Sequence, residues 1–162
     1  MIWPVLLATV ALLGSLITYG MAAALIVHLG VRLFRAGYTA LVFWKNVAVM
    51  SIVSLVTAAA HLLQIALWAG VYLLCGEISS PEKAFYFSAE NYTSLGYGDI
   101  TLSERWRLLG PLEAVNGLLL FGLSTALMFA AMSHLIVNRL HHLGLVSIEP
   151  VPTSVPGRTE SR

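Results

Sequence analysis

Charged residues are scarce in this chain, and three long stretches lack them entirely. Only 10% of the 162 residues are charged, whereas 58% are hydrophobic, and a soluble domain has about 25% charged residues. No Asp, Glu, Lys or Arg falls within residues 1–31, 46–76 or 114–138. As a helix, which rises about 1.5 Å per residue, each stretch exceeds the bilayer's hydrocarbon core of about 30 Å. These absences exclude an ordinary soluble domain and predict three membrane-spanning helices.

Cysteine is nearly absent too, and neither sign of charge is in clear excess. The single Cys75 excludes an intrachain disulfide framework and a zinc site built from cysteines. The net charge is only +1, so the chain has no basic footprint for nucleic acid. Nucleophile–base and metalloprotease motifs are also missing. We therefore expect a protein that is not an enzyme, has no cofactor and carries no soluble regulatory domain.

The charges that are present differ between the two sides of the predicted spans. Residues 77–113 carry six acids and three bases. Residues 32–46 form a linker with basic residues only: Arg32, Arg35 and Lys45. Because positive loops stay in the cytoplasm, we expect the N-terminus outside and the C-terminus inside. The tail over 143–162 is rich in Pro, Ser and Thr and is expected to be a disordered cytoplasmic segment.

The segment between the second and third spans opens with a helix start signal. Ser80 offers an N-cap hydroxyl, Pro81 suits the first helical position, and Glu82 places an acid in the first turn. A helix over 81–93 is too short to cross a bilayer. We therefore predict a re-entrant element that is packed in protein or lines a watery cavity.

The most specific motif in the chain follows this helix, as Thr-Ser-Leu-Gly-Tyr-Gly-Asp at residues 93–99. It resembles the selectivity-filter signature of the potassium channel pore-domain family. The likeness covers roughly 47–138 and is to a bacterial pore-only member with one extra N-terminal span. It implies an extra helix at 1–31 and a pore domain over 47–142, with an outer helix at 47–75, a pore helix at 81–93, a filter at 94–99 and an inner helix at 104–140.

The chemistry of such a filter can be stated from the residues. A dehydrated cation needs a ring of oxygens, which backbone carbonyls supply when successive residues turn them toward one axis. Gly96 and Gly98 tolerate the alternating backbone signs that this requires. The expected K⁺ ligands are Ser94, Leu95, Gly96, Tyr97 and Gly98. One chain supplies one strand of the filter, so the resemblance implies a homotetramer in a lipid bilayer, with K⁺ as the permeant ion.

Two filter residues differ from the family's usual pattern. Ser94 replaces a threonine, which keeps the hydroxyl but removes a methyl group that helps to fix its rotamer, and Leu95 replaces a valine. The leading hypothesis is a potassium-selective channel in the cell membrane, which the resemblance places in a bacterial inner membrane. The alternatives are a weakly selective monovalent cation channel and a non-conducting membrane scaffold or subunit.

Five residues outside the ligand set are candidates for filter support or gating. The resemblance implies that Glu90 pairs with Asp99 through a shared proton or water and braces the filter; otherwise Glu90 faces water. Gly117 is either a hinge or a site of close helix packing. Thr125 either lines a water-filled cavity on the pore axis or donates a hydrogen bond back to its own helix. Phe129 is either a hydrophobic constriction or faces lipid or another helix.

Three of the polar residues inside the predicted spans need a separate explanation: Glu113, His61 and Gln64. Glu113 is costly there and needs a partner. It either points behind the pore helix or sits at the positive end of a helix restarted by residues 110–111. Its expected partners behind the pore helix are Ser88, Tyr92 or a neighbouring subunit. His61 and Gln64 are three residues apart and share a helix face, so they either bond to another helix or form a proton site.

Overall fold

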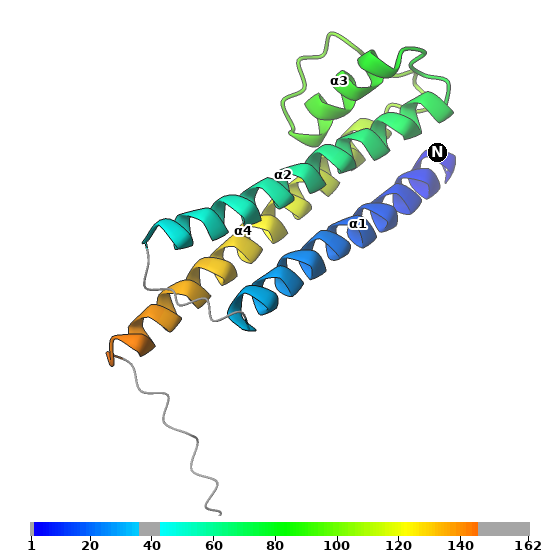
Figure 1. Cartoon of the computed structure of the whole chain (residues 1–162). Coiled ribbons are helices and arrows are strands. Elements are labelled where there is room, and N and C mark those ends of the chain that lie inside the picture. Colours follow the sequence, from blue (N-terminus) through cyan, green and yellow to red (C-terminus); the bar gives the residue numbers. More distant parts are fainter. Residues whose placement is uncertain (1, 36–42, 146–162) are drawn as a thin grey trace, which may run out of the picture.

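The computed structural model describes residues 2–35 and 43–145, and this part of the chain is mostly helical (Figure 1). The four helices are α1 (Ile2–Arg35), α2 (Phe43–Leu74), α3 (Pro81–Tyr92) and α4 (Leu109–His142). Among the described residues there is no strand, and α1, α2 and α4 are each long and apolar enough to cross a membrane. The prediction of an all-α membrane protein with three spanning helices is confirmed.

All three basic residues of the predicted linker belong to the helices themselves. α1 continues to Arg35 instead of ending at residue 31, and α2 begins at Phe43 instead of residue 47. The reason is that Arg and Lys are strong helix formers, so a charge marks the end of the apolar span without ending the helix. Of the predicted linker and tail, residues 36–42 and 146–162 lie outside the described part of the chain.

Local signals set the end of α2 and the start of α3. Gly76 follows α2 with a φ of 71°, and its amide donates to the carbonyl of Leu73 at 3.0 Å. A glycine in this left-handed conformation is a common helix stop. Ser80 caps α3, and its side chain accepts a hydrogen bond from the amide of Lys83, with Pro81 at the first helical position. This start was predicted from the sequence and is confirmed.

α4 begins at Leu109, later than the predicted residue 104. The residues before it form tight turns, in which the amides of Trp106 and Arg107 donate to the carbonyl of Ser103 at 3.0 and 2.9 Å. Ser103 is in turn fixed by Glu77, whose two carboxylate oxygens accept its amide and its hydroxyl, each at 2.8 Å. The contact of Glu77 with Ser103 thus keeps the residues before Leu109 out of α4.

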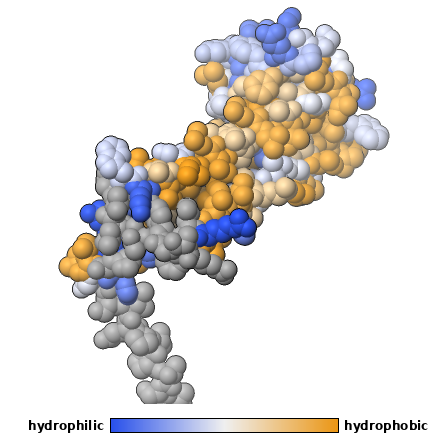
Figure 2. Space-filling view, in the orientation of Figure 1, coloured by the Kyte–Doolittle hydropathy of each residue, from blue (hydrophilic) through white to orange (hydrophobic). Residues whose placement is uncertain are grey.

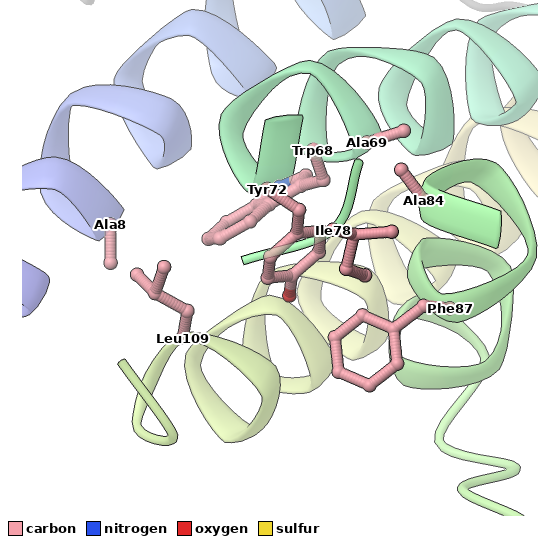
Figure 3. Packing of buried hydrophobic residues seen from close by; sticks show 8 residues of the cluster. All are labelled: Ala8, Trp68, Ala69, Tyr72, Ile78, Ala84, Phe87 and Leu109. Carbon is pink, nitrogen blue, oxygen red and sulfur yellow. The ribbon is translucent and has the colours of Figure 1, made fainter. Parts of the chain in front are cut away.

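A buried core joins all four helices at one end of the bundle. α1, α2 and α4 lie side by side, and α3 packs against α2 and α4 at the end that also holds the N-terminus of α1 (Figure 1). The rings of Tyr72 and Phe87 meet edge to face with 4.9 Å between centroids, a geometry that stabilises aromatic pairs beyond their buried area. The core consists of Ala8, Trp68, Ala69, Tyr72, Ile78, Ala84, Phe87 and Leu109 (Figure 3).

Ser15 attaches α1 to the rest of the bundle. This residue is fully buried. Its carbonyl accepts a hydrogen bond from the side-chain amide of Gln64 on α2 at 2.8 Å, and its hydroxyl accepts one from Asn116 on α4 at 3.1 Å. α1 is therefore fixed to both neighbouring spans by polar contacts at the same residue.

The opposite end of the bundle is more open. Figure 2 shows hydrophobic side chains along the middle of the bundle and hydrophilic ones toward its two ends. Away from α3, a groove of about 700 Å³ separates α2 from α4. Its lining includes Val47, Met50 and Leu55 from α2, and Met132, Ile136 and Arg139 from α4. Packing is thus tight at the end with α3 and looser at the other.

Candidate functional site

The loop after α3 folds back on the last turn of that helix. The amide of Ser94 donates to the carbonyl of Asn91 at 2.9 Å. The amides of Leu95 and Gly96 both donate to the carbonyl of Glu90, at 2.8 and 3.3 Å. The first residues of the predicted filter are therefore fixed to α3, and any rotation of the last turn of α3 moves them as well.

Every second residue of this loop has a left-handed backbone. The φ angles of Ser94, Gly96 and Gly98 are 60°, 52° and 77°. A Cβ at Gly96 or Gly98 would meet nothing within 4 Å in the single chain, so the backbone conformation, and not a lack of space, requires glycine there. The alternation that the motif predicted is present, and it also includes Ser94, where a left-handed conformation costs about 1–2 kcal/mol.

The loop lies on the surface of the single chain. Residues 93–99 are all exposed, including the large side chains of Leu95 at 56% and Tyr97 at 70%. Exposed apolar groups in a segment with a strained backbone indicate a surface that packs against something else. The single chain therefore offers one exposed strand of backbone carbonyls in this loop.

Glu90 and Asp99 lie near Tyr86, which the sequence interpretation did not single out. Glu90 is 4% exposed, and its Oε1 has no hydrogen-bond partner. Asp99 accepts the amide of Ile100 at 3.1 Å, and no direct hydrogen bond joins the two carboxylates among the described residues. Partial removal from water, together with Glu90 and Asp99 nearby, raises the pKa of Tyr86 to about 12. Since Tyr86 precedes Glu90 by one helical turn, the spacing alone could have identified it.

Glu113 points behind α3 and is fully buried. Its Oε2 accepts the hydroxyl of Tyr72 at 2.5 Å. Its Oε1 lies 2.6 Å from Ser88 Oγ, which is also 2.8 Å from the carbonyl of Ile65. Because a hydroxyl carries one proton, a neutral Glu113 that donates to Ser88 satisfies both contacts. The predicted partner Ser88 is confirmed, whereas Tyr72 takes the place expected for Tyr92.

The alternative interpretation, in which Glu113 sits at the start of a helix, is only partly correct. Residues 110–111 do lie in the first turn of α4, but Glu113 follows in the second turn and is held by side chains of α2 and α3. Buried polar groups in a span are normally satisfied by neighbouring helices, and this is the case here.

His61 and Gln64 bond to other helices, as one of their two interpretations predicted. His61 Nδ1 lies 2.8 Å from the hydroxyl of Tyr92 on α3, and its Nε2 lies 2.9 Å from Ser124 Oγ on α4. Gln64 donates to Ser15 on α1, as described above. The two residues therefore share a face of α2 but contact different helices.

Gly117 is a packing site between α4 and α3. A Cβ added there would lie 2.0 Å from the carbonyl oxygen of Tyr92. Two helical turns earlier, a Cβ on Gly110 would lie 2.8 Å from the side-chain oxygen of Asn91. The two glycines let α4 approach the C-terminal end of α3 closely. This contact favours the packing interpretation of Gly117 over the hinge.

Thr125 and Phe129 lie on the face of α4 that the single chain leaves exposed. The Thr125 hydroxyl donates back to the carbonyl of Phe121 at 3.0 Å, and Phe129 is 73% exposed. Exposed positions recur on this face every three or four residues, at Val115, Leu118, Gly122, Thr125, Phe129 and Met132. A role for Thr125 in a cavity and for Phe129 in a constriction stays a prediction.

Comparison with known families gives one match. Residues 60–134 match the model of a family described as ion channel. The match includes the C-terminal part of α2 from residue 60, all of α3, the 93–99 loop and most of α4, whereas α1 lies outside it. No significant match was found among curated proteins or among solved structures. Together with the three spans, this match indicates an ion channel in a membrane.

Proposed function

We propose that this chain is one subunit of a homotetrameric potassium-selective channel, with residues 94–98 as its filter. The observation that carries the proposal is the left-handed backbone at Ser94, Gly96 and Gly98, directly after a short helix that does not span the membrane. Such alternation is what a column of inward-facing carbonyls needs. The match of residues 60–134 to an ion channel family supports the same function.

A symmetric assembly would complete the site that one chain leaves open. The exposed 93–99 loop would meet its copies around an axis, and the exposed face of α4 would line the path below it. In that arrangement Thr125 and Phe129 face the axis. The C-terminal end of α3, which carries about half a negative charge, would point toward a cation beneath the filter.

The proposed orientation places the N-terminus and the 77–108 segment outside the cell. Basic residues gather at the other end, at Arg32 and Arg35 of α1, Lys45 of α2 and Arg139 of α4. By the positive-inside rule this end is cytoplasmic. K⁺ would then pass the filter near the outer face and the open α2–α4 end near the inner face.

A weakly selective monovalent cation channel is the second candidate. Ser94 lacks the usual methyl group and adopts a left-handed backbone without being glycine, with a φ of 60°. The side chain of Leu95 is larger than the usual valine and is exposed in the single chain. Both features would loosen the positions of the carbonyls that discriminate K⁺ from Na⁺.

The experiment is ion flux from purified protein in liposomes, with K⁺ or Na⁺ as the only permeant cation. We expect K⁺ flux that greatly exceeds Na⁺ flux. Gly96→Ala places a Cβ on a residue with a φ of 52° and should abolish flux while leaving the oligomer intact. Gly70→Ala is the matched control, because a Cβ there meets nothing within 4 Å and its φ is ordinary.

Each other outcome selects a different function. Equal K⁺ and Na⁺ flux identifies the weakly selective channel. Absence of any flux from the intact oligomer identifies a non-conducting scaffold. Undiminished flux in a correctly assembled Gly96→Ala protein would show that residues 94–98 are not the permeation path.

A further inference from the structure

Tyr92, the last residue of α3, is held by two other helices. It is fully buried, and its hydroxyl contacts His61 of α2 at 2.8 Å. Its ring meets that of Phe121 on α4 edge-on, with 5.5 Å between centroids. Its carbonyl oxygen faces Gly117 so closely that a Cβ there would lie 2.0 Å away. The hydroxyl, the ring and the carbonyl of Tyr92 are thus each fixed by a different neighbour.

The hydrogen bonds through His61 run in one direction. Ser124 Oγ donates its single proton to the carbonyl of Leu120 at 2.8 Å, so it must accept the contact from His61 Nε2 at 2.9 Å. A neutral imidazole protonated on Nε2 has its lone pair on Nδ1. Nδ1 therefore accepts the hydroxyl of Tyr92. The chain of hydrogen bonds passes from α3 through α2 to α4. Tyr92 donates to His61, His61 donates to Ser124, and Ser124 donates to the carbonyl of Leu120.

We infer that His61 is a positioning residue for the filter. By fixing the Tyr92 hydroxyl, His61 influences the ion preference of the filter without touching an ion. This inference rests on the proposed function. Only Thr93 separates Tyr92 from Ser94, and the amides of Leu95 and Gly96 bond to the same last turn of α3. The position of that turn therefore sets where the first filter carbonyls stand.

Loss of the His61 contact would release Tyr92 at one of its three attachment points. The ring and the carbonyl would stay packed against Phe121 and Gly117, so α3 should keep its place. The last turn could then rotate slightly, and four copies of this change would widen or distort the same ring of oxygens. Discrimination between ions of similar charge depends on the number and placement of these oxygens, so selectivity should respond more than assembly.

Gln64 provides a matched control on the same face of α2. It is fully buried and makes an interhelical hydrogen bond of 2.8 Å, the same length as that between His61 and Tyr92. Its partner is Ser15 on α1. A Gln64 variant therefore loses a comparable bond in the same span without releasing α3.

The experiment measures the K⁺/Na⁺ permeability ratio from reversal potentials in planar bilayers, with K⁺ on one side and Na⁺ on the other. His61→Leu and Tyr92→Phe should each lower the ratio by about fivefold, the factor that corresponds to one hydrogen bond of ordinary net strength. The double variant should be no worse than either single one, because both remove the same bond. Gln64→Leu should leave the ratio unchanged.

His61→Gln tests the proposed chemistry directly. The side chain of glutamine has an acceptor oxygen and a donor NH₂ group, so it can replace the acceptor and the donor of the neutral imidazole and should restore most of the ratio that His61→Leu loses. A contribution from bulk or packing alone would not distinguish glutamine from leucine in this way. Tyr92→Phe removes one oxygen atom and no packing, so it still tests the inference if His61→Leu assembles poorly.

Two results would overturn the inference while leaving the proposed function in place. One is a wild-type permeability ratio in assembled His61→Leu and Tyr92→Phe channels. The other is an equal loss in Gln64→Leu, which would show that any buried polar bond has the same effect. A wild-type protein that conducts no ions would overturn the inference and the proposed function together.

Discussion

Replacement of Gly117 by alanine should separate α4 from α3, because the contact there is between backbones. The added Cβ would lie 2.0 Å from the carbonyl oxygen of Tyr92 and 3.0 Å from its carbonyl carbon, and real Cβ atoms essentially never approach closer than 3.0 Å. The two helices must therefore move apart by about 1 Å. A backbone carbonyl cannot rotate away as a flexible side chain could, so the packing at the end of α3 must change.

The size of this effect follows from a comparison with Gly122, five residues later on the same helix. A Cβ on Gly122 meets nothing within 4 Å, so Gly122→Ala adds only the helix preference of alanine, up to about 1 kcal/mol. Gly117→Ala gains the same preference but also overpacks the contact, which typically costs about 1–3 kcal/mol. The difference in unfolding free energy between the two variants should therefore be about 1–3 kcal/mol, with Gly117→Ala the less stable.

The measurement is the loss of helical circular dichroism during titration of micelle-bound protein with sodium dodecyl sulfate, for both variants and the wild type. Equal unfolding free energies for the two variants would refute the packing argument. A Gly117→Ala protein that is as stable as the Gly122→Ala protein but opens less often than the wild type in single-channel recordings would instead support a hinge. The two interpretations of Gly117 thus predict different results in the same pair of proteins.

Three further predictions concern the outer end of the chain and its orientation. Glu90→Ala should change how long the filter stays conductive more than which ion it prefers. Equal open lifetimes of the variant and the wild type, at both low and neutral outside pH in single-channel recordings, would contradict this. With Cys75 replaced by serine, a cysteine at Glu104 should be labelled from outside and one at Leu145 only after permeabilisation; the reverse pattern would invert the topology. Burial and the nearby Glu77 raise the pKa of the Cys75 thiol, so less thiolate forms at neutral pH, and Glu77→Gln should lower that pKa and speed maleimide labelling; an unchanged rate would argue against this cause.

Elements that depend on local chemistry could be predicted from the sequence. The three spans follow from stretches without charge, since burial in lipid depends on the composition of each stretch. The start of α3 follows from Ser80 and Pro81, because a capping group acts on amides within three residues of itself. The demand for glycine at residues 96 and 98 follows from the same local geometry and agrees with the left-handed angles in the structure.

Contacts between distant residues could not be assigned in the same way. The sequence indicated that Glu113 needs a partner, but Tyr72 lies 41 residues away on another helix, and no spacing rule connects the two. The late start of α4 has a similar origin, because Glu77 holds Ser103 across 26 residues. A hydropathy pattern says which residues are buried together, whereas the choice of hydrogen-bond partner requires the packed structure.

The exposed residues of α4 show a second limit. Thr125 and Phe129 were singled out as candidates for a cavity and a constriction, and the structure puts both on the face that the single chain leaves uncovered. Such a face can line a pore, meet a neighbouring subunit or contact lipid. The choice depends on the arrangement of several chains, which neither the sequence nor the fold of one chain contains.

The length of the three spans couples this bundle to the thickness of its membrane. α1, α2 and α4 contain 34, 32 and 34 residues, so each is about 50 Å long, well beyond a hydrocarbon core of about 30 Å. Such helices tilt or extend past the bilayer. Because Ser15 bonds α1 to both neighbours, the three helices must tilt as one unit. The core around α3 resists deformation, so a thinner or thicker bilayer should act mainly on the open groove between α2 and α4.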